Sequence, residues 1–195
     1  MNDKTNHFEK FRADIIGIDK TFISPFGEKK IVYADWIASG RLYKQIEETS
    51  NDDWENSFKV NVSGPFYFIR DLLSSLKRMS DSFVLTIGSG AGTIPMRGRS
   101  AYCSSKFALR GLILSLDEEL KDSAPHMCLI TLGSTITNFG NKSIMQKTEE
   151  FKKGKAYFPV EWVVNKLIEI IENPKRDNEI TLFPGDHGFG VWKKP

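Results

Sequence analysis

The segment that most constrains the fold runs from Phe83 to Leu120. An apolar stretch, Phe83 to Ile87, leads into the small residues 88–92, and a helical pattern begins at about Ser100. A buried strand, a glycine-containing loop and a long helix in this order are typical of an α/β protein with a parallel sheet. The same order places small and polar residues at the carboxyl end of the strand, where ligands commonly bind in such sheets.

Strand and helix patterns alternate along the rest of the chain. The expected helices span residues 52–79, 100–121, 143–153 and 159–172, and the expected strands span residues 82–87, 126–132 and 179–183. The first helix contains Pro65, which should kink it. The strand at 82–87 is apolar enough to be buried on both faces. We therefore predict an α/β fold with a partial, doubly wound, Rossmann-like parallel sheet.

The first fifty residues follow a different pattern. A turn signal at Ser24-Pro25-Phe26-Gly27, with apolar residues on both sides, predicts a two-stranded β-hairpin within residues 15–37. The predicted organisation is an appendage over residues 1–50 and an α/β domain over residues 51–195.

Composition excludes several classes of function. The chain has 195 residues, of which 40% are hydrophobic and 27% charged, and its formal net charge is +2. So small a charge, without a basic stripe, argues against nucleic acid and acidic membranes as partners. Two cysteines give no disulfide framework and favour a cytoplasmic location, and three scattered histidines suggest no metal site.

Three polar side chains carry the predicted chemistry. Ser89 follows the strand, and Tyr102 and Lys106 stand four residues apart on one face of the next helix. A phenol has a pKa near 10. A lysine ammonium about 4 Å away favours the phenolate by roughly 4 kcal/mol at an effective dielectric of 20, which is about three pKa units. Tyr102 would then serve as a general acid–base at neutral pH, with Ser89 holding the substrate oxygen by a hydrogen bond.

Residues 53–195 resemble the short-chain dehydrogenase/reductase family. The resemblance rests on Ser89 and Tyr102-x-x-x-Lys106, on Asn61 in Val60-Asn61-Val62-Ser63-Gly64, and on Gly133-x-x-x-Thr137. It implies hydride transfer between NAD or NADP and a small-molecule carbonyl or alcohol. It further implies that Asn61 supports a water in the proton relay, that Lys106 also binds the nicotinamide ribose, and that Gly133 and Thr137 bind the nicotinamide. The family's usual assembly implies a homodimer through helices 52–79 and 100–121. In such proteins the charged run from Lys147 to Lys155 lies near a mobile substrate lid, and we expect it to be a solvated face.

The family's glycine-rich phosphate-binding turn is absent from the sequence. Residues 1–50 contain only Gly17, Gly27 and Gly40, in none of the required spacings. Instead, the segment from Ile16 to Arg41 resembles the start of a class V, cysteine-desulfurase-like aminotransferase. The simplest interpretation is a fusion of a foreign opening to a truncated dehydrogenase domain that lacks its first three strands. The alternative to an enzyme is a non-catalytic interaction protein on a half-Rossmann scaffold.

Overall fold

The structure is a computed structural model that describes residues 21–24, 27–30, 49–121, 123–140 and 142–192. The chain separates into two units, residues 1–36 and residues 37–195. In the first unit, β1 (Thr21–Ser24) and β2 (Gly27–Lys30) form an antiparallel hairpin in which Ser24 pairs with Gly27. A hairpin is present within the predicted range 15–37, and the residues that bound the predicted turn signal, Ser24 and Gly27, pair with each other. The other features expected before residue 49, including the segment that resembles an aminotransferase, lie mostly outside the described residues.

The second unit contains a parallel sheet in the order β3–β4–β5. Its strands are β3 (Phe83–Ile87), β4 (His126–Leu132) and β5 (Glu179–Leu182). Ile87 pairs with Ile130, and Leu132 pairs with Leu182, so the carboxyl ends of the strands lie together. The predicted parallel α/β fold is confirmed, and each predicted strand agrees with the observed one to within a residue at either end.

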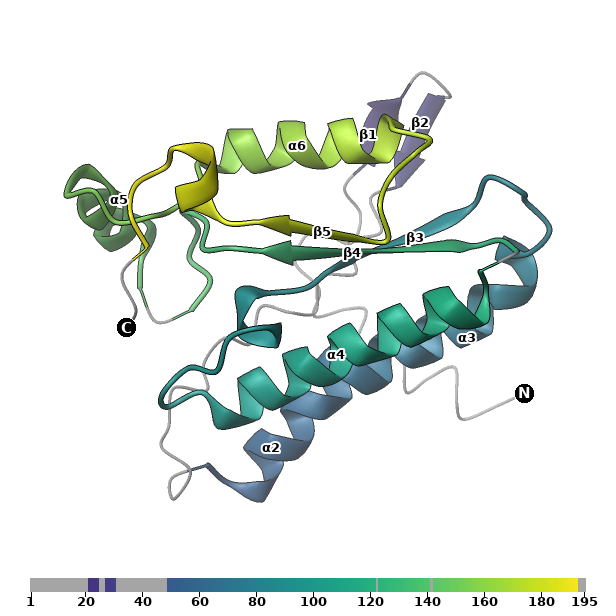
Figure 1. The fold of residues 1–195 in the computed structure, drawn as a ribbon, viewed down its shortest axis with the longest axis horizontal. Helices are drawn as coiled ribbons and strands as arrows, with labels where there is room; N and C mark the ends of the chain where they lie inside the picture. The colour runs from purple at the N-terminus through teal and green to yellow at the C-terminus, as the bar shows by residue number, and fades with distance from the viewer. Residues whose placement is uncertain (1–20, 25–26, 31–48, 122, 141, 193–195) are drawn as a thin grey trace. The chain divides into compact units, whose positions relative to one another are not determined.

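Helices cover both faces of this sheet (Figure 1). The helical segments are α2 (Asn51–Phe58), the π-helical turn η3 (Lys59–Ser63), α3 (Gly64–Leu76), α4 (Ser100–Glu119), α5 (Ile144–Lys152) and α6 (Val160–Glu172). Helices α3 and α4 lie on one face and α6 on the other, while α5 lies beyond the carboxyl ends of β4 and β5. Two covered faces are the doubly wound arrangement that the sequence predicts.

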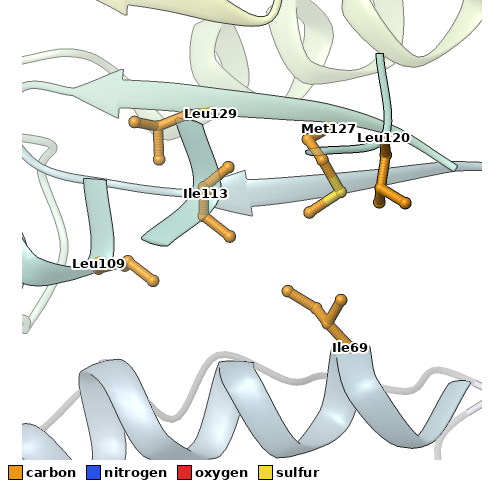
Figure 2. Close-up of a cluster of buried hydrophobic side chains, with 6 residues drawn as sticks. All are labelled: Ile69, Leu109, Ile113, Leu120, Met127 and Leu129. Atoms are coloured by element: carbon orange, nitrogen blue, oxygen red, sulfur yellow. The ribbon is translucent and has the colours of Figure 1, made fainter. Parts of the chain in front are cut away.

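The alternation of side chains along β4 builds two hydrophobic cores. Met127 and Leu129 point toward α3 and α4, where they pack with Ile69, Leu109, Ile113 and Leu120 (Figure 2). Cys128 and Ile130 point the other way and pack with Phe158, Val163, Ile170 and Leu182. Because successive side chains of a strand point to opposite faces, one apolar strand holds both helical layers.

The expected kink at Pro65 is replaced by a π-helical turn. The chain stays helical from Asn51 to Leu76, with η3 between α2 and α3, and the Gly64 N–H donates to the carbonyl of Lys59, five residues earlier. A proline ring clashes with the carbonyl four residues before it, which here belongs to Asn61. The wider π turn makes room for that ring just before Pro65, where α3 begins.

The prediction that the strand at 82–87 is buried on both faces is wrong. All five residues of β3 are only half-buried, because in the described part of the sheet β3 pairs with β4 alone and lies at the edge. Trp54, on α2, is 43% exposed. Among the helices that the structure describes, none is long and apolar enough to cross a membrane.

Candidate active site

Ser89 stands on a tight turn at the carboxyl end of β3. The turn continues as the short 3₁₀ helix η4 (Gly90–Gly92), and Ser89 caps it in an extended conformation. The Ser89 Oγ accepts a hydrogen bond from the Ala91 N–H at 3.2 Å and is half-buried. The hydroxyl is therefore fixed in place by its own turn, and its proton can be donated to another group.

Tyr102 and Lys106 lie one turn apart on α4, as their spacing predicts. Lys106 is only 1% exposed, and its Nζ lies 5.9 Å from the centroid of the Tyr102 ring. Tyr102 is half-buried. A buried lysine therefore lies beside a tyrosine ring that solvent can still reach.

Gly92 brings the Ser89 turn onto the helix that carries Tyr102 and Lys106. A Cβ atom at position 92 would lie 2.8 Å from the carbonyl oxygen of Lys106. Such an approach is possible only for a residue without a side chain. The close backbone contact places the turn that carries Ser89 directly against the helical turn that carries Lys106.

Asn61 reaches this site from the π-helical turn through a buried serine. Its Nδ2 donates to the Ser105 Oγ at 2.9 Å, and the Ser105 Oγ donates to the backbone carbonyl of Tyr102 at 2.9 Å. Asn61 is 4% exposed and Ser105 is fully buried. The Asn61 Oδ1 is also buried and accepts no hydrogen bond from the part of the chain that is described.

The loop after β4 also contacts the site. The Gly133 N–H donates to the Leu182 carbonyl at 2.8 Å, and a Cβ at Gly133 would lie 2.5 Å from the Cδ of Pro184. The Thr137 Oγ1 accepts from the Phe139 N–H at 3.3 Å, and the Phe139 ring centroid lies 6.4 Å from that of Tyr102. The loop therefore approaches Tyr102 through Phe139, two residues after Thr137.

The charged run of α5 is not the uniform solvated face that we expected. Lys147 is 7% exposed, and its Nζ donates to the carbonyls of Phe139 at 2.6 Å and Thr135 at 3.3 Å. Burial, reinforced by the positive charge of Lys142, lowers the pKa of the Lys147 ammonium. Some side chains of α5 face solvent, whereas the Lys147 side chain is directed into the protein.

Glu150 joins α5 to its neighbours. It pairs with Lys142, accepts from the Tyr157 Oη at 2.6 Å and lies 3.2 Å from the Lys155 Nζ. The hydrogen bond from Lys142, followed by that from Tyr157, lowers the pKa of the Glu150 carboxyl to about 2. At neutral pH the carboxylate is ionised and holds three groups from outside the helix.

Sequence reasoning missed three residues of this region: Ser105, Phe139 and Lys147. Ser105 lies within the Tyr102–Lys106 motif. Helical periodicity could have indicated that this position is buried. Phe139 and Lys147 acquire their contacts through folding of a loop onto other elements, and no local spacing indicates either contact.

Known proteins resemble the chain in the same region. The family model for short chain dehydrogenase matches residues 38–148, starting before the predicted domain boundary at residue 50. The 2,3-dihydro-2,3-dihydroxybenzoate dehydrogenase of Escherichia coli strain K12 is 35% identical over 92 residues, which are 47% of this chain and 37% of that protein. The 17-beta-hydroxysteroid dehydrogenase type 1 of Homo sapiens is 28% identical over 147 residues, which are 72% of this chain and 45% of that protein. The chain thus spans less than half the length of these relatives.

A solved structure has the same fold. The alcohol dehydrogenase of the archaeon Thermococcus sibiricus, complexed with 5-hydroxy-NADP, superposes with a TM-score of 0.62 over 80% of this chain and 61% of that chain, at 22% sequence identity. This likeness supports the Rossmann-like assignment of the sheet and its helices. Because the family model matches more than half of the 195 residues, the chain belongs to the short-chain dehydrogenase family.

Proposed function

We propose that the chain is an oxidoreductase that transfers a hydride between NAD or NADP and a small-molecule carbonyl or alcohol. The observation that carries the proposal is the meeting of three residues: Tyr102 and buried Lys106 share a face of α4, and the Ser89 turn packs on the Lys106 backbone. Membership of the short-chain dehydrogenase family supports the reaction class. NAD and NADP remain equal candidates.

The proposed roles follow from what each group can donate or accept. In the direction of reduction, the Ser89 hydroxyl donates a hydrogen bond to the carbonyl oxygen of the substrate, and Tyr102 donates the proton. The Lys106 cation stabilises the phenolate that Tyr102 then becomes. Asn61 supports a water that returns the proton.

The residues around Tyr102 fit the nicotinamide end of a cofactor, which would supply the hydride. Lys106 would bind the ribose, and Gly133 and Thr137 would bind the nicotinamide. The Asn61 Oδ1, a buried acceptor without a hydrogen bond from the described residues, fits a water in the proton relay. No glycine-rich turn in the sequence serves the pyrophosphate. If two charge-assisted hydrogen bonds to phosphate are missing, affinity falls by roughly 10²- to 10⁴-fold.

Oxidation of NADH and NADPH in the presence of a panel of carbonyl compounds tests the proposal. We expect turnover that Tyr102→Phe abolishes, because the substitution removes the group that donates the proton. Tyr67→Phe, at a tyrosine that is 52% exposed on α3, is the matched control and should retain full activity. Turnover that survives Tyr102→Phe would exclude the proposed mechanism.

The absent glycine-rich turn favours a second candidate, a non-catalytic interaction protein on the same scaffold. Titration of the chain with NADH and NADPH, followed by fluorescence, separates the two candidates. Saturable binding at micromolar concentration would exclude the second candidate, the non-catalytic interaction protein. If neither cofactor binds at millimolar concentration, the proposed oxidoreductase function is excluded.

We also propose a homodimer through α2, α3 and α4. Several large apolar side chains of these helices are exposed, and large apolar side chains left exposed on adjacent helices suit a surface that another protein covers. They are Trp54, Phe66, Tyr67, Phe68, Leu72 and Phe107. A reducing cytoplasm is the proposed location, since Cys103 and Cys128 are both free.

A further inference from the structure

Lys147 is a buried cation in a helix on the protein surface. It is 7% exposed, whereas Lys152, the other lysine of α5, has a side chain that is 65% exposed. An ammonium loses its hydration when it is buried, so a protein tolerates it only where acceptors replace water. A side chain placed at this cost is expected to have a specific structural role.

The acceptors of Lys147 are two carbonyls of the loop after β4. Its Nζ lies 2.6 Å from the Phe139 carbonyl oxygen and 3.3 Å from that of Thr135. The two carbonyls bracket Thr137, so the lysine ties together both ends of the segment 135–139. Hydrogen bonds from a charged donor are about twice as strong as neutral ones, so this tie restrains the segment more than a neutral hydrogen bond would.

The same segment contacts the proposed catalytic tyrosine. The Phe139 ring centroid lies 6.4 Å from the Tyr102 ring centroid, and the Phe139 N–H donates to the Thr137 Oγ1 at 3.3 Å. The residue whose carbonyl Lys147 holds is therefore also the residue that touches Tyr102. Movement of this carbonyl would move the ring and the threonine hydroxyl with it.

Helix α5 is itself held firmly enough to support such a tie. Ser143 and Gln146 form a capping box at its first turn, in which each side chain bonds the backbone N–H of the other residue. Glu150, one turn after Lys147, pairs with Lys142, Tyr157 and Lys155. The lysine thus extends from an anchored helix to the loop.

We propose that Lys147 is a positioning residue that holds the segment 135–139 against Tyr102 and so sets the placement of Thr137 and Phe139 in the site. The catalytic meaning of this placement rests on the proposed oxidoreductase function. The placement itself depends only on the contacts of Lys147.

Hydrogen exchange followed by mass spectrometry tests the placement without requiring activity. The amides of Ile136, Thr137 and Phe139 donate to Phe158 O, Thr135 O and Thr137 Oγ1, so each reports opening of the segment. Lys147→Met keeps the length of the side chain and removes its donors. Loss of a charged hydrogen bond should speed exchange at these amides by roughly 10- to 100-fold. Lys147→Arg, which keeps the cation and its donors, should recover most of the protection.

The matched control is Lys152→Met, at the exposed lysine of the same helix, which should leave exchange in the segment unchanged. The amide of Gly133, which donates to the Leu182 carbonyl at the base of the loop, should keep its protection in every variant. If Lys147→Met fails to fold, Lys147→Gln replaces it, because Gln is neutral and too short to reach both carbonyls. Unchanged exchange at residues 136–139 in the folded variant would overturn the proposal.

Steady-state kinetics, with the substrate found for the wild-type chain, test whether this placement matters for catalysis. Lys147→Met should lower kcat/KM by about 10²-fold, the loss expected for reacting groups misplaced by about 1 Å, and Lys147→Arg should restore it. An effect on exchange with kcat/KM unchanged would refute the catalytic role of the placement. A wild-type chain that binds no cofactor and turns over no substrate overturns the proposed function alone, and the exchange result still decides on Lys147.

Discussion

Ser105 shows how one side chain outside the proposed proton transfer can determine the geometry of the site. Its hydroxyl accepts from Asn61 and donates to the Tyr102 carbonyl, and it is fully buried. It therefore connects the π-helical turn to the helix of the proposed acid–base. Without it, the Asn61 amide would have neither its nitrogen nor its Oδ1 bonded to the described residues.

Ser105→Ala should therefore lower the free energy of unfolding by about 1–3 kcal/mol, the cost of a buried polar group left unsatisfied. Ser104→Ala, at the half-buried neighbour on α4, is the matched control. Both substitutions bring the same gain in helix propensity, so the difference between the variants isolates the hydrogen bonds. Urea denaturation measures both values. Equal stability of the two variants would mean that the Asn61–Ser105 bond contributes nothing.

At the scale of elements, the site depends on the contact between η4 and α4. Gly92 has its α-carbon so close to the Lys106 carbonyl that an added Cβ would lie 2.8 Å from it. Gly111 is also on α4, but a Cβ there would meet nothing within 4 Å. The same substitution at the two glycines therefore compares a crowded position with an open one.

Gly92→Ala should force the Ser89 turn away from α4 and lower the free energy of unfolding by about 1–3 kcal/mol, a typical cost of overpacking. Gly111→Ala should raise it by about 0.5–1 kcal/mol, since alanine in a helix interior loses less conformational freedom than glycine. Thermal unfolding of the two variants in one buffer measures the opposite signs. A stabilising Gly92→Ala would show that the turn does not pack on Lys106 as described.

At the scale of the whole molecule, the features predictable from sequence are those that depend on local spacing. The strand 126–132 is predicted to the residue because a short, largely apolar run between two helical patterns favours a strand buried on both faces. Tyr102 and Lys106 fall on one face because a helix returns to it every four residues. Figure 1 shows the doubly wound arrangement that this alternation of strands and helices implies.

The features that the sequence did not predict depend on contacts between distant segments. Lys147 looks like any other lysine in a charged run, and only the folded loop 133–140 brings carbonyls to it. The half-burial of β3 depends on which strands flank it, and the π turn at Lys59–Ser63 depends on how Pro65 is accommodated. Periodicity describes which face is apolar, but it does not say what covers that face.

The exposed side chains of α3 and α4 illustrate this limit. Helical spacing places Phe66 and Leu72 among the core positions, yet both are 39% exposed, and Phe68 and Phe107 are 51% and 45% exposed. Single exposed apolar residues are ordinary, but large ones on adjacent helices suit a surface that another protein covers. A second copy of the same helices is the partner we propose.

If α3 and α4 pair with their copies, a charge on this surface should break the pairing, because an ionised carboxylate in an apolar interface loses its hydration without compensation. We expect Phe68→Glu and Phe107→Glu to convert a dimer to a monomer in sedimentation velocity, with the circular dichroism spectrum unchanged. Met145→Glu, at a side chain 74% exposed on α5, carries the same charge away from the proposed interface and should remain dimeric. A wild-type chain that sediments as a monomer at micromolar concentration would exclude the homodimer. A dimer that persists with both glutamate substitutions would show that its interface lies elsewhere.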